Sequence, residues 1–425
     1  MGNIEELTRA YAAALDNADP LAGFRSRFSS PDPELIYLDG NSLGRLPHGI
    51  SARMQQAVEH EWGADLIRAW NKGWWEAPAR IGEMIAPLLG AGPRQVIVSD
   101  QTSLNLFKLA AAALKLRPGR SRIITDTLNF PSDLYILQGI ADILGGAHEI
   151  VRIGSVDGGI APDLQALAAA IDERTALVTL SHVTFKSGYL YDMRAVTELA
   201  HRTGALTLWD LSHSVGVVPI ELDACDVDFA LGCTYKYLNG GPGSPAFLYV
   251  NTRLQPDALS PIWGWWGEAQ PFSFELDYQP APGVRRFLTG TAPVLSMIAL
   301  EAALAPVVDA GLERIRQKSI ALTQYAISLS EARLAPQGFS LGSPRDAERR
   351  GSHVSLRHPE GYRINRALID ELKVIPDFRE PDNLRLGFAP LYVSFQDVWE
   401  GMDRLGRVVQ ERRFEKYPQQ RMLVT

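Results

Sequence analysis

The stretch D-F-A-L-G-C-T-Y-K-Y-L-N-G-G-P-G-S, residues 228–244, decides how this chain is interpreted. Residues 227–231 are apolar except for Asp228 and predict a short buried strand. The strand delivers Lys236, which lies between two tyrosines, and the chain then turns through N-G-G-P-G at 239–243. A lysine at a strand end, followed by residues that permit unusual backbone angles, is poorly explained as a solvated surface charge. It suits an amine that forms a covalent bond with a ligand.

Upstream of this stretch, short apolar segments alternate with amphipathic helical segments. Strands are predicted at residues 95–99, 122–125, 149–153, 176–181 and 205–210, and helices at 104–116, 132–144, 162–172 and 193–203. This alternation predicts an α/β fold with a mostly parallel sheet of the seven-stranded type between helices. Ligands bind at the carboxyl ends of such strands. This rule selects residues 99–103, 126–133, 181–187, 210–214 and 234–244.

The alternation stops near residue 300. A long helix at 307–334, a strand at 352–357, a helix at 363–373 and a final helix at 395–416 predict a smaller α+β domain. We therefore expect an N-terminal arm and loop (1–50) packing on the small domain, a large ligand-binding domain (51–300) and a small C-terminal domain (301–425). Residues 51–90 read as helix with four tryptophans, which more often form a core or a subunit interface than a ligand site.

Composition excludes several classes of protein. The net charge of −7 argues against a nucleic-acid partner, and no apolar run is long enough to span a membrane. The first residues, M-G-N-I-E-E-L, are acidic and are not followed by a signal-type hydrophobic segment. Cys225 and Cys233 are too few for a disulfide framework or a zinc site, so we expect reduced core cysteines and no metal. These features predict a cytoplasmic protein.

Asp210 ends a predicted strand in L-W-D-L-S-H-S, one strand before Lys236. A pyridoxal ring accepts electrons only when its ring nitrogen is protonated, and a carboxylate against that nitrogen holds the proton. Lys236 and Asp210 together therefore predict a pyridoxal phosphate site in which Lys236 carries the cofactor as a Schiff base. His213 lies at the same strand end. Taken alone, Asp210 is equally compatible with a helix cap or a structural ion pair.

Other strand-end loops carry polar residues that also have ordinary structural explanations. Thr102 and Ser103 precede a helix, where hydroxyls, free amides and the helix dipole favour phosphate, although most helix starts favour Ser or Thr. Ser181 is either a cofactor ligand or a satisfied core serine. Two explanations are open for N-F-P-S-D at 129–133. Either Phe130 stacks on a ligand ring and Asp133 contacts that ring, or Ser132 and Asp133 cap the following helix. The candidates of this loop are Phe130, Pro131, Ser132 and Asp133.

Three other lysines compete with Lys236. Lys72 and Lys108 lie in helical segments, where we expect solvated side chains. Lys186, in F-K-S-G, is at a predicted strand-end loop but has no aspartate one strand earlier. We therefore rank it behind Lys236.

These motifs together resemble those of the kynureninase family. The resemblance is carried by L-D-G-N-S-L-G (38–44), F-P-S-D (130–133), S-H-V-T-F-K-S-G (181–188), W-D-L-S-H-S (209–214), C-T-Y-K-Y-L-N-G-G-P-G-S (233–244), G-W-W-G (264–267) and L-R-L-G-F-A-P-L-Y (384–392). It spans nearly the whole chain. It implies a pyridoxal-phosphate enzyme of fold type I, near the class V aminotransferases. The implied reaction is hydrolytic Cβ–Cγ cleavage of L-kynurenine or 3-hydroxykynurenine, giving L-alanine and anthranilate or 3-hydroxyanthranilate, in tryptophan degradation.

The resemblance also implies roles for single residues. Lys236 would move the Cα proton, Asp210 would pair with the ring nitrogen beside His213, and Tyr235 would contact the phosphate and transfer protons. Arg385 would bind the substrate α-carboxylate. The remaining implied cofactor ligands are Thr102 and Ser103 at the phosphate, Phe130 stacked on the ring, and Asp133 and Ser181 at its polar edge.

Trp265 and Thr291 match positions that reach the phosphate from a neighbouring subunit. The resemblance thus implies a homodimer with shared active sites and the N-terminal arm at the dimer interface. Two positions depart from the family pattern. Glu268 stands where relatives often have histidine, and Thr291 where some have asparagine. Both concern the substrate end of the site.

Two alternatives remain. A cysteine desulfurase or selenocysteine lyase of the same fold needs a catalytic cysteine on a late loop, but both cysteines precede Lys236. A non-catalytic protein that only binds pyridoxal phosphate would have no need of the complete set formed by Lys236, Asp210, Tyr235 and Arg385.

Overall fold

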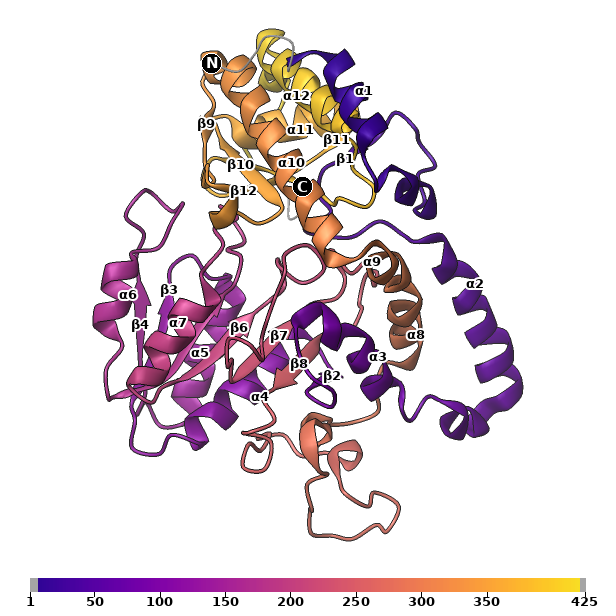
Figure 1. Ribbon diagram of the computed structural model, residues 1–425, viewed down its shortest axis with the longest axis vertical. Helices are drawn as coiled ribbons and strands as arrows, with labels where there is room; N and C mark the ends of the chain where they lie inside the picture. The colour runs from indigo at the N-terminus through magenta and orange to yellow at the C-terminus, as the bar shows by residue number, and fades with distance from the viewer. Residues whose placement is uncertain (1–6, 421–425) are drawn as a thin grey trace.

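A seven-stranded sheet forms the centre of the computed structural model, which describes residues 7–420 (Figure 1). The acidic start, residues 1–6, and residues 421–425 lie outside the described part. The strand order is β2-β8-β7-β6-β5-β3-β4, and every neighbouring pair is parallel except the two that involve β8. The strands are β2 (Val96–Val98), β3 (Arg122–Asp126), β4 (Glu149–Ile153), β5 (Thr175–Ser181), β6 (Leu206–Asp210), β7 (Phe229–Gly232) and β8 (Phe247–Val250). The predicted α/β fold with a mostly parallel sheet is confirmed.

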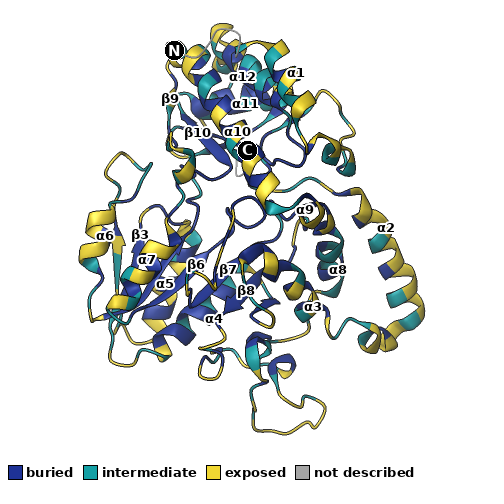
Figure 2. Cartoon of the chain, in the orientation of Figure 1, coloured by how far each residue is buried: buried dark blue, intermediate teal, exposed yellow. Residues whose placement is uncertain are grey.

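The sheet is buried on both faces, which explains the continuous apolar runs of its strands. Successive residues of a strand point to opposite faces. Leu208 and Phe229 accordingly pack in one core layer, and Trp209 and Ala230 pack in the other. Figure 2 shows the inner strands of this sheet as buried and the outer faces of the surrounding helices as exposed, while the edge strand β4 is only partly buried. The crossover helices are α4 (Thr102–Lys115), α5 (Pro131–Ile143), α6 (Leu164–Ala170) and α7 (Met193–Arg202).

The C-terminal part of the chain forms a second, smaller sheet of order β12-β13-β10-β9, with antiparallel pairing. Its strands are β9 (Ser340–Leu341), β10 (His353–Arg357), β12 (Asp377–Arg379) and β13 (Asn383–Gly387). The helices α10 (Leu312–Leu329) and α11 (Gly361–Leu372) pack against it, and α12 (Phe395–Gln410) packs on these two helices. The helix predicted at 307–334 is divided, because Gly311 adopts a φ of 77° between α9 (Ala305–Ala310) and α10. The final helix ends at Gln410, shortly before Arg412 adopts a left-handed φ of 53°.

The N-terminal segment packs against this smaller sheet and its helices (Figure 1). Helix α1 (Arg9–Ala18) contacts α12, and β1 (Ile36–Tyr37) pairs in parallel with β11 (Val374–Ile375). The single helix expected over 51–90 is wrong, because Leu66 and Gly73 take positive φ angles and interrupt it. The segment contains α2 (His48–Gln56) and α3 (Ala77–Ile85), and helix α8 (Val294–Ala303) packs against both.

Short 3₁₀ and π segments complete the described chain. They are η2 (Ala22–Arg27), η3 (Ala57–Asp65), η4 (Leu66–Lys72), η5 (Ala86–Leu89), η6 (Trp265–Gly267), η7 (Gly283–Phe287), η8 (Ser330–Leu334), η9 (Ala335–Gln337), η10 (Ala347–Arg349) and η11 (Arg413–Lys416). Within residues 7–420 no single helix is long and apolar enough to cross a membrane. One sharply bent pair, Val294–Ala310 with Leu312–Gln337, meets the criteria of length and composition only when its halves are combined.

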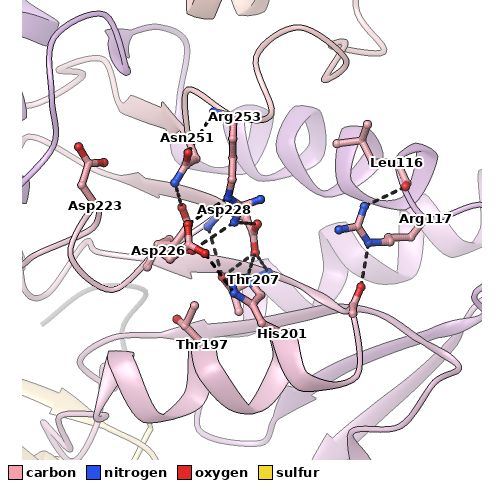
Figure 3. Close-up of polar contacts among 12 residues, drawn as sticks. Leu116, Arg117, Thr197, His201, Thr207, Asp223, Asp226, Asp228, Asn251 and Arg253 are labelled. Atoms are coloured by element: carbon pink, nitrogen blue, oxygen red, sulfur yellow. Dashed lines mark hydrogen bonds and ion pairs between the residues drawn. The ribbon is translucent and has the colours of Figure 1, made fainter.

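A buried polar cluster fixes the amino end of β7, the strand that leads to Lys236 (Figure 3). Asp228 immediately precedes this strand and is fully buried. Its Oδ2 accepts the amide of Thr207 at 2.7 Å and lies 2.8 Å from Nε2 of His201, while Oδ1 pairs with Arg253. Burial opposes ionisation of Asp228, but the hydrogen bond and charge of His201 and the charge of Arg253 outweigh it and lower the pKa.

Candidate active site

A cavity of about 260 Å³ opens at the carboxyl ends of the central strands. Loops after β2, β3, β5, β6 and β7 contribute to it, as expected for a ligand site in a parallel sheet. Most of the predicted site residues therefore meet in one place. Its lining consists of Gln101, Thr102, Ser103, Phe130, Ser132, Asp133, Ser181, Phe185, Asp210, Ser212, His213, Tyr235 and Lys236.

Lys236 lies in the turn after β7, with Nζ 2.9 Å from Nε2 of His213 and 5.9 Å from the centre of the Tyr235 ring. The N-terminal L-D-G-N-S-L-G motif holds this turn from outside, because the amide of Gly44 donates to the carbonyl of Tyr235 at 2.8 Å. A Cβ atom on Gly44 would lie 2.3 Å from the carbonyl oxygen of Lys236. Only glycine permits this close approach of the two backbones.

Asp210 is buried at the end of β6, and its Oδ1 accepts the amide of Ser212 at 2.8 Å and the Ser212 hydroxyl at 2.6 Å. Oδ2 has no hydrogen bond to any of residues 7–420. Burial raises the pKa of Asp210, and the charge of Lys236 only partly opposes this. Burial and then the Asp210 charge raise the pKa of Asp133. The two carboxyl groups thus face the cavity with unused capacity for hydrogen bonds.

His213 is also incompletely satisfied. Nδ1 is buried and has no partner among the described residues, while Nε2 faces Lys236. Burial, followed by the charge of Lys236, lowers the pKa of His213, so that the ring is neutral near pH 7. A neutral imidazole carries one donor and one acceptor.

The phosphate-binding prediction concerns the start of α4. Gln101, and not Thr102 or Ser103, is the N-cap residue, so the plain N-cap explanation for the two hydroxyls is wrong. They occupy the first two helical positions, and Oγ of Ser103 lies 3.0 Å from Oγ of Ser132. Free amides of the first turn and three hydroxyls converge here, as an anion requires.

The loop before α5 behaves similarly. Phe130 is the N-cap residue of α5, so the capping alternative for Ser132 and Asp133 is also wrong. The Phe130 ring is 44% exposed and packs edge-on against Phe185, with 5.3 Å between ring centres. Ser181 lines the cavity and also donates to Asn129, so it is satisfied while facing the site.

The residues fit pyridoxal phosphate as a set. The cavity offers an amine, a buried carboxylate with a free oxygen, a partly exposed aromatic ring and a hydroxyl-rich helix start. These groups match the carbonyl, ring nitrogen, ring face and phosphate of that cofactor.

Comparison with known proteins assigns the family. The family model described as "Kynureninase C-terminal domain" matches residues 315–405. A kynureninase of Pseudomonas fluorescens is 44% identical over 410 residues, covering 95% of this chain and 96% of that protein. A kynureninase of Burkholderia mallei (strain SAVP1) is 46% identical over 403 residues, covering 94% of each chain. This chain belongs to the kynureninase family. The family resemblance stated from the sequence is confirmed, and the chain is an enzyme of this family.

Solved structures show the same fold at low identity. A cysteine desulfurase from Thermococcus onnurineus NA1 has a TM-score of 0.76 at 20% identity, covering 94% of this chain and 98% of that one. C-DES with glycine covalently linked to its PLP cofactor has a TM-score of 0.75 at 17% identity, covering 89% and 99%. These likenesses confirm fold type I. Family membership does not favour the cysteine desulfurase alternative, and Cys233 is buried in the core.

Arg385 does not line the cavity but lies behind its wall in the kynureninase-family fold. It is buried in β13, where Nε donates to Oδ1 of Asp377 at 3.1 Å and Nη2 donates to Oγ of Ser42 at 2.8 Å. Nη1 donates to the carbonyl of Phe185, a residue of the cavity lining. Asp377 and Ser42 were not singled out from the sequence.

Three further candidates lie outside this cavity. Pro131 lines a neighbouring cavity. Trp265 lies 41% exposed beside Trp75 and lines a different cavity of about 750 Å³, and Thr291 is exposed. The predicted roles of Trp265 and Thr291 required a neighbouring subunit, and the roles of all three residues stay predictions.

The prediction of a solvated Lys108 is wrong. The side chain is fully buried, and Nζ lies 2.7 Å from both Oδ2 of Asp100 and the carbonyl of Phe287. Helix α4 is covered both by the sheet and by the segment around Phe287, so the polar position faces inward. Lys72 is exposed and pairs with Asp65, as expected.

Proposed function

We propose that this kynureninase-family enzyme hydrolyses the Cβ–Cγ bond of L-kynurenine or 3-hydroxykynurenine, releasing L-alanine and anthranilate or 3-hydroxyanthranilate. The observation that carries this function is 44–46% identity to kynureninases over nearly the full chain. The cofactor is pyridoxal phosphate, which supplies an electron sink for charge at the substrate Cα when bound.

Lys236 and Asp210 have separate roles in handling protons. The hydrogen bond to neutral His213 holds the Lys236 amine at the cavity wall, from which Lys236 removes and returns the proton at the substrate Cα. Asp210 is held by hydrogen bonds from Ser212, and its free oxygen would hold a proton on the ring nitrogen of the bound cofactor. Because Asp210 is buried, its charge acts on the ring with little screening by water.

Tyr235 is the proposed donor at the ketone oxygen. Hydrolysis at a ketone needs a proton shuttle near neutral pH. The neighbouring Cys233, and then burial, raise the pKa of Tyr235, so the phenol stays protonated and donates a hydrogen bond. Tyr235 lines the cavity beside Lys236, where it can reach both the cofactor and the substrate.

Arg385 is the proposed ligand of the substrate α-carboxylate. Asp377 occupies the edge formed by Nε and Nη2, so a substrate carboxylate must bind the edge formed by Nη1 and Nη2. There it replaces the carbonyl of Phe185 or the hydroxyl of Ser42 as acceptor. Asp377 thereby acts as a positioning residue that fixes the plane of the guanidinium group.

A homodimer with shared active sites is part of the proposal. Exposed apolar side chains gather on the segment that follows Trp265, including Phe272, Phe274 and Leu276. Clustered exposed apolar residues mark interaction surfaces, and the Trp265 ring packs against Phe272 with 6.3 Å between ring centres. We further propose cytoplasmic location and the division into an arm (1–50), a large cofactor domain (51–300) and a small domain (301–425).

The function is tested by mixing the purified, cofactor-loaded protein with L-kynurenine and following anthranilate fluorescence, then repeating the assay with 3-hydroxykynurenine. We expect turnover of at least one substrate. Variants at Glu268 and Thr291 then test which ring substitution is preferred. Absence of product from both substrates would contradict the reaction, while the fold and family would stand.

A further inference from the structure

A second cavity, of about 500 Å³, lies beside the active site, where the large sheet meets the smaller one. One wall comes from the loop after β3, from residues 155–160 and from residues 184–187. The opposite wall comes from the C-terminal part of the chain. It consists of Gly342, Arg357, Pro381 and Asn383.

The charged residues of this lining are both cations, Lys186 and Arg357. Lys186 is half-buried, and its ammonium makes no hydrogen bond or ion pair with the residues that the structure describes. Burial, and then the charge of Arg357, lower the pKa of Lys186, while Asp382 opposes the shift. Asp382 forms an ion pair with Arg357 but not with Lys186, so a further anion that contacts the partly desolvated ammonium stabilises the pair of cations.

Contacts with Asp382 and with the carbonyl of Gly158 hold the Arg357 side chain in this position. Nε lies 3.3 Å from Oδ1 of Asp382, and Nη2 donates to the carbonyl of Gly158 at 3.2 Å across the cavity. A Cβ atom on Gly342 would lie 2.9 Å from Cγ of Arg357, so the absence of a side chain there leaves the path open for the arginine. Nη1 is left as a donor with no partner among residues 7–420.

The rest of the lining is mixed. Hydroxyl and amide groups lie with the two cations, but much of the wall is apolar. The apolar lining residues are Leu128, Pro131, Leu134, Ile160, Phe185 and Pro381. An occupant with a negative head and an apolar body satisfies both parts.

This cavity and the active site share a wall. Asn129 and Pro131 line the second cavity, whereas their neighbours Phe130 and Ser132 line the active site. Phe185 lines both, and its carbonyl accepts a hydrogen bond from Arg385. An occupant of the second cavity therefore contacts the same loops that hold the cofactor-facing and substrate-facing residues.

We propose that this cavity is a regulatory site for a small carboxylate with an apolar body, bound by Lys186 and Arg357 and tying the two parts of the chain together. The assignment does not depend on the reaction proposed above, because binding is measured without turnover.

The test is calorimetric titration of benzoate into the cofactor-loaded protein, with acetate as the probe that lacks an apolar body. Lys186→Met removes the free ammonium and keeps most of the stem. Lys115→Met makes the same change on the exposed last turn of α4 and is the matched control. Arg385→Lys weakens carboxylate binding in the active site. Thermal melting establishes that each variant is folded.

We expect Lys186→Met to weaken benzoate binding by about tenfold or more, as loss of one charge-assisted contact does. Lys115→Met should be close to wild type, and Arg385→Lys, which alters only the hydrogen bond to Phe185, should weaken binding much less than Lys186→Met. Acetate should bind at least about tenfold more weakly than benzoate, because it leaves the apolar wall unfilled. Benzoate binding that survives Lys186→Met but is lost in Arg385→Lys would assign the ligand to the active site and overturn the proposal. Absence of benzoate binding, or equal binding of acetate, would overturn it as well.

Discussion

Two clusters, each of an aspartate, a histidine and a basic residue, lie at opposite ends of β6 and β7. At the amino end, Asp228 meets His201 and Arg253 (Figure 3), and at the carboxyl end Asp210 lies in one cavity with His213 and Lys236. The Asp228 carboxylate is fully hydrogen-bonded and its pKa is lowered. Asp210 has a free oxygen and a raised pKa, and His213 has an orphaned Nδ1.

The difference separates stability from function. In the Asp228 cluster every charge has a partner within the chain, so removing one partner leaves an uncompensated charge and destabilises the fold. In the Asp210 cluster some buried polar atoms have no hydrogen-bond partner. These atoms destabilise the fold until a ligand satisfies them. Residue type alone does not distinguish the two clusters; the unused hydrogen-bonding capacity does.

The largest expected effect is on Lys236. Lys236→Ala should lower turnover by about 10⁴-fold or more and abolish the absorbance of lysine-bound cofactor, because both the covalent attachment and the Cα base are lost. Steady-state kinetics and absorbance spectra measure this, with the exposed Lys72→Ala as control. Turnover and spectrum both retained in Lys236→Ala would end the assignment.

Asp210→Asn should come next, lowering turnover by about 10²- to 10³-fold, because a neutral amide holds the ring-nitrogen proton poorly. The melting temperature of the cofactor-free protein should change little, since burial already disfavours the charge of Asp210. Kinetics and thermal melting of the same preparation separate the effect on turnover from the effect on stability. A large drop in stability with unchanged turnover would assign Asp210 to the structural class.

Asp228→Asn should show the reverse pattern. Loss of the carboxylate leaves Arg253 and His201 without their buried partner, and we expect a destabilisation of about 3 kcal/mol. Turnover per folded molecule should be close to wild type. Chemical denaturation measures the first quantity and active-site-normalised kinetics the second. Intact stability would show that the comparison between the clusters is wrong.

The smallest expected effect is the pH dependence of the stability difference between wild type and Asp228→Asn. The pKa of Asp228 is lower in the folded than in the unfolded state. Its stabilising contribution is therefore present above the unfolded value of about 4 and is lost as the pH falls through the folded value. The stability gap between wild type and Asp228→Asn should be constant near neutrality and shrink in acid. A gap that widens as the pH falls would reverse the sign and contradict the ion-pair explanation.

Much of the central sheet was predictable because its strands are buried on both faces and read as apolar runs. Strand β8 was missed, since it returns antiparallel directly after the lysine turn with no intervening helix to mark it. The cavity residues followed from the rule that ligands bind at strand ends. Asp377 could not be found, because it pairs with Arg385 only through the antiparallel register of β12 and β13. Lys108 was misjudged because periodicity predicts a helix without showing what covers each of its faces.

The contact between Gly44 and Tyr235 has a consequence for how the enzyme is made. The L-D-G-N-S-L-G loop leaves the ribosome early, yet its backbone partner is translated only after the whole central sheet as far as β7. This loop has no native contact with the lysine turn during most of synthesis, and its docking belongs to the late stage of folding. A chain interrupted before residue 235 cannot acquire this contact, so the cofactor-carrying turn is completed only when nearly the entire large sheet exists.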